Sequence, residues 1–132
     1  MPIWLESREI KLFHDLLIDE HGGLRGIKDE GALESTLARP QNLLSYHPEA
    51  TITSLAACYG FGFCQNHVFN DGNKRIALTA LNIFLQLNGW NLTCSEAEAV
   101  WVIREVASGN LDESLLAAWI GKNSEPFDLD SQ

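Results

Sequence analysis

The chain has 132 residues, 45% of them hydrophobic, and a formal net charge of −9 at pH 7, so it is long enough to bury a core as one domain. The negative charge argues against nucleic acid and anionic membrane surfaces as partners, because Lys and Arg supply most of the affinity for both. No apolar run approaches the ~20 residues of a membrane span, and the N-terminus lacks the pattern of a signal peptide. We therefore expect a soluble, cytoplasmic protein.

Apolar residues at helical spacing predict a first helix over residues 7–21, which ends at Gly22. His14 and His21 lie seven residues apart and therefore on one face of this helix. We expect both on the helix surface, with His21 favoured by the dipole at the C-terminal end.

A glycine-rich loop separates the first helix from the second. Asp29 is the predicted N-cap of a short helix that ends before Pro40. Two prolines and the lack of periodicity predict a loop or a small β-hairpin over residues 40–50.

The third predicted helix is capped by Thr51 or Thr53 and reaches about residue 66. Gly60 and Gly62 lie inside it, where glycine weakens a helix. The close approach of another helix explains their presence.

The fourth helix begins near Asp71 or Gly72 and ends at residues 88–89. It is apolar on nearly every side, and a helix of this kind belongs in the centre of a bundle. Its apolar residues are Ile76, Ala77, Leu78, Ala80, Leu81, Ile83, Phe84, Leu85 and Leu87.

The last third of the chain holds two more predicted helices. Ser95 and Glu98 form a capping box that opens a fifth helix, which reaches about residue 108. Asp112 caps a sixth helix. The one candidate strand lies at residues 89–94.

These elements predict an all-α fold: a compact bundle of about six helices around one central apolar helix, with room for a short β-hairpin flap. The domain covers residues 1–123, and residues 124–132 form an acidic, disordered tail. Cys58, Cys64 and Cys94 have no CxxC spacing, which predicts reduced, mostly buried thiols.

The sequence HVFNDGNKR at residues 67–75 places two cations at the unfavourable end of the fourth helix. Lys74 and Arg75 fall in the first turn, where free N–H groups and the helix dipole favour anions. The helix accommodates both if an anion lies between them, and helix N-termini bind phosphates for this reason. Gly72 lets the backbone approach a ligand closely, and Asn73 adds a neutral donor. The pattern predicts a phosphate site.

Two residues before this turn add chemistry to the phosphate site. Asp71 is placed to hold Mg²⁺, which binds one or two carboxylates together with substrate phosphates. His67 supplies an imidazole that accepts a proton from an incoming hydroxyl. Phe69 lies between them and anchors the loop by burying its ring. The set predicts group transfer from a nucleotide to a hydroxyl.

Each of these residues also has a simpler interpretation. Asp71 is a common N-cap residue, and Lys74 and Arg75 are compatible with surface charges paired to acids. Cys64 and His67 could share a helical face, but the further ligands that a zinc site needs are missing. A Cys–His nucleophile pair has equally little support.

The motif HVFNDGNKR resembles the Fic/Doc motif, His-x-Phe-x-Asp/Glu-Gly-Asn-Gly-Arg-x-x-Arg, and is closest to the Doc (death-on-curing) branch. Residues 14–40 resemble the amino-terminal half of Doc-type chains, and residues 88–100 resemble the segment after the motif in those chains. The segment near residues 40–50 corresponds in order to the flap that aligns the target segment. The resemblance implies a compact α-helical fold.

The resemblance also implies roles for the motif residues. His67 is the general base and Asp71 is the Mg²⁺ ligand. Gly72, Asn73 and Arg75 bind the phosphates of ATP.

Two departures from the AMP-transferring motif match the Doc branch. Lys74 replaces the second Gly of the motif, and Leu78 replaces its last Arg. Members of the Doc branch bind the nucleotide in the opposite sense and transfer the γ-phosphate as protein kinases. The implied substrate is elongation factor Tu, phosphorylated on a Thr, which halts translation. The implied partner is a small antitoxin of the prevent-host-death type, whose disordered tail folds on the toxin.

A third departure leaves alternatives open. The Doc pattern has an Arg two residues before the motif His, where this chain has Gln65. The main hypothesis is a Doc-type toxin, an ATP- and Mg²⁺-dependent protein kinase acting on a translation factor. The alternatives are an AMP transferase of the wider Fic class and an inactive homologue that only binds its partner.

Overall fold

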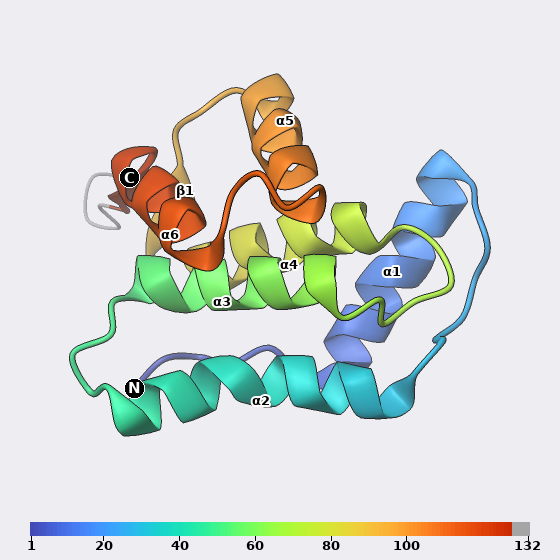
Figure 1. Cartoon of the computed structure of the whole chain (residues 1–132), viewed down its shortest axis with the longest axis horizontal. Coiled ribbons are helices and arrows are strands. Elements are labelled where there is room, and N and C mark those ends of the chain that lie inside the picture. The colour runs from blue at the N-terminus through green and yellow to red at the C-terminus, as the bar shows by residue number, and fades with distance from the viewer. Residues whose placement is uncertain (128–132) are drawn as a thin grey trace.

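The computed structural model describes residues 1–127, which form six helices and two short strands (Figure 1). In chain order these are α1 (Ser7–His21), α2 (Glu30–Tyr46), α3 (Ile52–Gln65), α4 (Asn73–Leu87), β1 (Trp90–Leu92), α5 (Glu96–Ala107), α6 (Glu113–Lys122) and β2 (Ser124–Pro126). The predicted, mainly helical bundle is confirmed. Within residues 1–127, none of the helices combines the length and the hydrophobicity of a membrane span.

The helices α3 and α4 lie side by side in the middle of the molecule (Figure 1). The helix α3 packs against α2, α4, α5 and α6, while α1 packs against the other side of α4. A Cβ atom on Gly60 of α3 would lie 2.7 Å from Cδ2 of Leu81 in α4. The predicted close approach at this glycine is therefore confirmed, and α4 shares the centre with α3, which is buried more completely.

Side-chain caps start four of the helices where the sequence predicts them. The capping residues are Asp29, Thr51, Ser95 and Asp112, and each accepts a hydrogen bond from the backbone N–H three residues later. The predicted capping box at the start of α5 is only half present. The carboxylate of Glu98 accepts instead from the indole N–H of Trp119, at 3.0 Å, which joins α5 to α6.

The second helix is longer than the sequence predicts. It runs through Pro40 to Tyr46, so its predicted end is wrong. The predicted loop over residues 40–50 is confined to residues 47–51, and no hairpin flap forms there. Proline inside a helix costs about 3 kcal/mol. Pro40 is itself buried, however, and Leu43 and Leu44 beyond it pack against the core. The burial of these side chains outweighs the lost helical hydrogen bond.

The two strands pair with each other. The strand β1 falls inside the predicted segment 89–94 and runs antiparallel to β2, with Trp90 opposite Pro126. Residues 124–126 were predicted to belong to the disordered tail, and for them the prediction is wrong. Their backbone is ordered because it pairs with β1. The backbone N–H of Phe127 donates to the carbonyl of Gly89 at 2.7 Å, and residues 128–132 of the predicted tail lie outside the described residues.

Candidate active site

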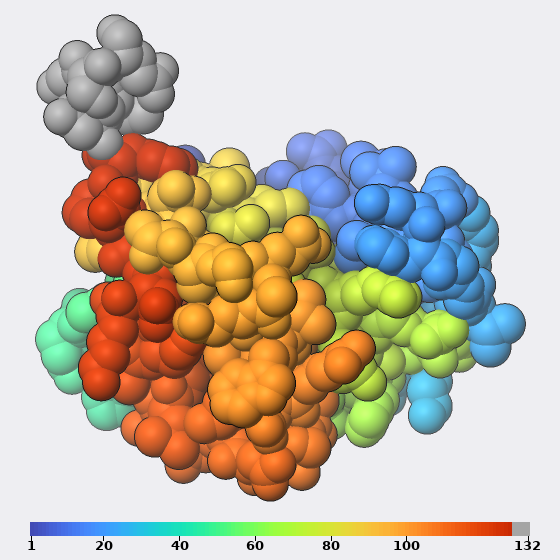
Figure 2. Space-filling view, turned by 90° about the horizontal axis from the view of Figure 1, so that it is seen from above, coloured from blue at the N-terminus to red at the C-terminus, as the bar shows by residue number. Residues whose placement is uncertain are grey.

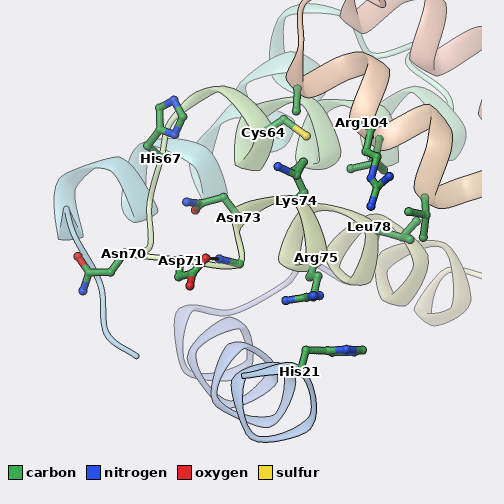
Figure 3. A pocket seen from close by; sticks show the side chains of 14 residues that line it. His21, Cys64, His67, Asn70, Asp71, Asn73, Lys74, Arg75, Leu78 and Arg104 are labelled. Atoms are coloured by element: carbon green, nitrogen blue, oxygen red, sulfur yellow. Dashed lines mark hydrogen bonds between the residues drawn. The ribbon is translucent and has the colours of Figure 1, made fainter. Parts of the chain in front are cut away.

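A pocket of about 650 Å³ opens at the N-terminal end of α4 (Figure 3). Its walls come from α1, α3, α4, α5 and the loop between α3 and α4. On the face of the molecule in Figure 2, α5 (orange) and the segment around residue 70 (yellow-green) are neighbours at the surface. The pocket brings together all six residues predicted to form the site: His67, Asp71, Gly72, Asn73, Lys74 and Arg75.

The loop between α3 and α4 is held in place by the loop between α1 and α2. Phe69 forms an isolated antiparallel bridge with Ile27. The backbone N–H of Asn70 donates to the carbonyl of Gly26 at 3.1 Å, and the Asn70 side chain donates to the carbonyl of Arg25 at 3.1 Å. The glycine-rich loop of the sequence is thus the outer support of the site.

His14 of α1 supports the same loop from inside the protein. Its ring stacks on Phe69, with centroids 3.8 Å apart and an interplanar angle of 7°, and its Nε2 lies 2.8 Å from the carbonyl oxygen of Asp71. A carbonyl only accepts, so Nε2 carries the proton. The prediction that His14 lies on the helix surface is wrong, because it is 1% exposed. It falls between Ile10 and Ile18 on the buried i, i+4, i+8 stripe of α1, a spacing that could have revealed it.

The helix α4 has Gly72 as its N-cap, so the interpretation of Asp71 as an N-cap is wrong. Gly72 has φ +74°, a left-handed conformation that favours glycine, and no side chain caps the helix. The first helical hydrogen bond runs from the Ile76 N–H to the Gly72 carbonyl. The three N–H groups between these residues therefore have no acceptor within the helix and can bind an anion.

The side chain of Asn73 closes the loop that precedes α4. Its Oδ1 accepts from the backbone N–H of Phe69 at 3.0 Å, and its Nδ2 donates to the carbonyl of Phe69 at 2.9 Å. Both ends of the Asn73 side-chain amide are thus bonded to the backbone of the loop and hold its conformation. The donor that Asn73 offers to a ligand is then its backbone N–H.

The carboxylate of Asp71 is fixed by two backbone groups and remains exposed. Its Oδ2 accepts from the N–H of Leu24 at 3.2 Å, and its Oδ1 accepts from the N–H of Gly72 at 2.8 Å. These hydrogen bonds, assisted by the charge of Arg75, hold the pKa of Asp71 below its usual value of 3.8. The group is therefore an ionised oxygen donor with free lone pairs.

This donor set fits a magnesium ion that is bound together with a substrate. Within residues 1–127, no group of three or more His, Cys, Asp or Glu side chains is arranged to hold a metal. A magnesium ion is commonly held by one carboxylate plus phosphate oxygens and water. Asp71 can supply that single carboxylate.

His67 lies on the loop at the rim of the pocket (Figure 3). Its side chain is exposed, and its φ of +47° is the only positive φ of a non-glycine residue in the described part of the chain. Such a conformation costs about 1–2 kcal/mol. A ring at the rim can be reached by a hydroxyl on a large substrate.

Lys74 and Arg75 line the pocket from the first turn of α4. In Figure 3, Lys74 extends toward Cys64 and α5, and Arg75 extends toward His21 on α1. Within residues 1–127, neither forms a salt bridge, so the interpretation as surface charges paired to acids is not what the structure shows. Other basic residues of the chain do form salt bridges: Arg8, Lys11, Arg25 and Arg39.

Three other residues bear on the predictions. Arg104 of α5 lines the pocket as a third cation, which the sequence does not reveal because it lies about 30 residues beyond the motif. Cys64 also lines the pocket, but burial raises its pKa to about 11, so it is a neutral thiol and a poor nucleophile beside His67. Gln65 turns away and donates to the carbonyl of Val106 at 3.2 Å.

Fold and site together define a small helical protein in which an uncapped helix start, two unpaired cations, a carboxylate and a histidine share one pocket within residues 1–127. The model of the Fic/DOC family matches residues 4–85, and the chain belongs to this family. It is 34% identical over 85 residues to the protein kinase Doc of Escherichia phage P1, which covers 64% of this chain and 68% of the relative. It is also 34% identical over 101 residues to the toxin Doc of Mycolicibacterium smegmatis, with coverages of 74% and 77%.

Proposed function

We propose that this chain is a Doc-type toxin that transfers the γ-phosphate of ATP to a Ser or Thr hydroxyl of a protein. The observation that carries the proposal is the pocket that His67 and Asp71 share with the cations Lys74 and Arg75 at the start of α4. Relatives named protein kinase Doc and toxin Doc support both the activity and the role.

The start of α4 binds the phosphates of the nucleotide. Backbone N–H groups that follow Gly72 donate to phosphate oxygens, and Lys74 and Arg75 balance their charge. Asp71 holds Mg²⁺, which when bound neutralises charge on the phosphates. The two loops and His14 hold the Asp71 carboxylate beside the start of α4. The metal ligand therefore has a fixed position relative to the bound phosphates.

His67 then acts as the general base. Its unprotonated ring nitrogen takes the proton of the target hydroxyl as the hydroxyl oxygen forms a bond to the γ-phosphorus. The bond from that phosphorus to the β,γ-bridging oxygen breaks, its electron pair stays on the bridging oxygen, and ADP leaves. The proton on His67 passes to solvent, which reaches the exposed ring.

The target we propose is a translation factor in the cytoplasm, with elongation factor Tu as the candidate that the family resemblance implies. The partner we propose is a small antitoxin with a disordered segment that folds on the toxin. The test is to look for a small antitoxin-like reading frame just upstream of the gene and to co-express its product, which should restore growth of cells that express this chain.

Labelled ATP tests the proposed reaction. The purified chain is incubated with Mg²⁺, elongation factor Tu and ATP labelled in either the γ or the α position, beside the His67→Ala variant. The expected result is label on the protein from the γ position only, and none with His67→Ala or after Mg²⁺ is chelated. Label from the α position would show that the chain transfers AMP and is not a kinase. No label from either position, with no effect of expression on growth, would leave only a binding module.

A further inference from the structure

Arg104 is a cation of the pocket that comes from a different helix than the motif. It lies in the last turn of α5 and is exposed. Figure 3 shows its guanidinium group extending from α5 into the space between Lys74 and Leu78. It forms no salt bridge with any residue of the part of the chain that the structure describes. A role at the C-terminal end of the helix dipole would favour a cation here, but would not require it to point across toward α4.

The backbone at Arg104 is held in place by the packing of α5. Its neighbours Val102, Ile103 and Val106 are buried in the core. The side chain of Gln65 at the end of α3 donates to the Val106 carbonyl, which ties this turn of α5 to the start of the active-site loop. The guanidinium group is therefore carried by a rigid support, as a binding residue requires.

The pocket concentrates positive charge in an acidic protein. Lys74, Arg75 and Arg104 are three of the nine basic residues of a chain with net charge −9, and the one carboxylate in the pocket lining, among the described residues, is Asp71. The next hollow along α4, of about 540 Å³, shares Leu78 with the pocket but is lined by a carboxylate, Glu96, and by no cation of residues 1–127. The positive region thus ends at Arg104, and it fits an anion that carries several charges.

We propose that Arg104 binds the phosphate chain of the nucleotide from α5 and contacts the phosphates that are not transferred. This inference rests on the proposed function. The γ-phosphate belongs next to His67 and Asp71 at the start of α4, and Leu78, four residues after Lys74, offers no donor to the remaining phosphates. The guanidinium fork of Arg104 supplies donors at that place, in a geometry that matches two phosphate oxygens.

Calorimetric titration with inorganic tripolyphosphate in the presence of Mg²⁺ tests the inference without relying on catalysis. The set of proteins is wild type, Arg104→Gln, Arg104→Lys and the charge-matched control Lys122→Gln, an exposed residue in the last turn of α6. We expect Arg104→Gln to weaken binding about tenfold, Arg104→Lys to weaken it less, and Lys122→Gln to leave it unchanged. The affinity for inorganic monophosphate should fall much less than that for tripolyphosphate, a difference that loss of helix stability alone would not produce.

The outcomes separate this inference from the kinase. If Arg104→Gln binds tripolyphosphate as wild type does while wild type transfers γ-phosphate, the Arg104 inference is wrong and the kinase stands. If Arg104→Gln binds tripolyphosphate more weakly than wild type does, but wild type transfers no γ-phosphate, the Arg104 inference stands and the kinase is wrong. A wild-type chain that does not bind tripolyphosphate overturns the Arg104 inference, and transfer of label from ATP then decides the kinase by itself. Thermal melting of each variant confirms that the proteins compared are folded.

Discussion

The ring of His14 lies flat against the ring of Phe69, with the centroids 3.8 Å apart. Phe69 stands between His67 and Asp71 in the chain, so this contact fixes the middle of the loop that carries the proposed base and metal ligand. The same imidazole donates to the carbonyl of Asp71. The helix α1 therefore determines, from the buried side of the loop, where the side chains of His67 and Asp71 lie.

Replacing His14 should damage both stability and catalysis. His14→Ala leaves a cavity against Phe69 and an unpaired carbonyl at Asp71, so we expect the free energy of unfolding to fall by about 2–4 kcal/mol. Urea denaturation measures the loss, and phosphoryl transfer under conditions where the variant is folded should show a lower kcat. The exposed His47 provides the control, since His47→Ala should change neither quantity. Equal stability of wild type and His14→Ala would contradict a supporting role.

His67 should be essential for transfer and dispensable for folding. Its side chain is exposed and its φ is +47°, so His67→Ala should lower kcat by about 10²–10⁴-fold with little effect on unfolding. Glycine takes this φ without strain, so His67→Gly should be at least as stable as His67→Ala. Single-turnover transfer and urea denaturation measure the two effects. A variant that keeps wild-type kcat would rule out His67 as the base.

Gly23 should control the position of Asp71. A Cβ atom at Gly23 would lie 2.6 Å from Oδ2 of Asp71, and its φ of +119° is unfavourable for other residues. Gly23→Ala should therefore displace the carboxylate and raise the Mg²⁺ concentration needed for half-maximal transfer several-fold, with a loss of stability of about 1–3 kcal/mol. Gly22→Ala is the matched control, because Gly22 also has a positive φ, +80°, but nothing lies within 4 Å of its Cβ position among the described residues.

The two glycine variants should differ mainly in the Mg²⁺ concentration that they need for half-maximal transfer. Gly22→Ala is expected to lose stability alone, because the strain it introduces lies in the backbone. If both variants shift the Mg²⁺ dependence equally, the contact between position 23 and Asp71 does not carry the effect.

Local sequence signals predicted the elements that depend on neighbours in the chain. Helix caps at Asp29, Thr51, Ser95 and Asp112 are formed by residues three positions apart, and the sequence shows them directly. Pro40 misled the prediction, because the burial that keeps α2 helical beyond it comes from side chains of other helices. The strand β2 was missed because its partner lies more than 30 residues away in the chain.

For the site, too, the sequence predicts the residues that are close together in the chain. The six residues that the motif at residues 67–75 predicts for the site line one pocket, since they are consecutive or nearly so. His14 and Arg104 reach the site from α1 and α5, and Leu24 holds the carboxylate from the loop after α1. Such contacts depend on the tertiary fold, so a single sequence gives little sign of them.

The low pKa of Asp71 predicts how stability depends on pH. Backbone hydrogen bonds from Leu24 and Gly72 place the folded-state pKa below 3.8, the value expected in the unfolded chain. The ionised carboxylate therefore stabilises the fold fully above pH 3.8, and this contribution is lost as the pH falls from 3.8 through the folded-state pKa. The difference in unfolding free energy between wild type and Asp71→Asn should thus be constant near neutral pH and shrink in acid. Urea denaturation across this range, with NMR titration of the Asp71 carboxyl carbon, measures both quantities. A carboxyl that titrates above 3.8 in the folded protein would show that these hydrogen bonds do not hold it ionised. At pH 7, Asp71→Asn should also raise the Mg²⁺ concentration needed for transfer, because the variant lacks the carboxylate.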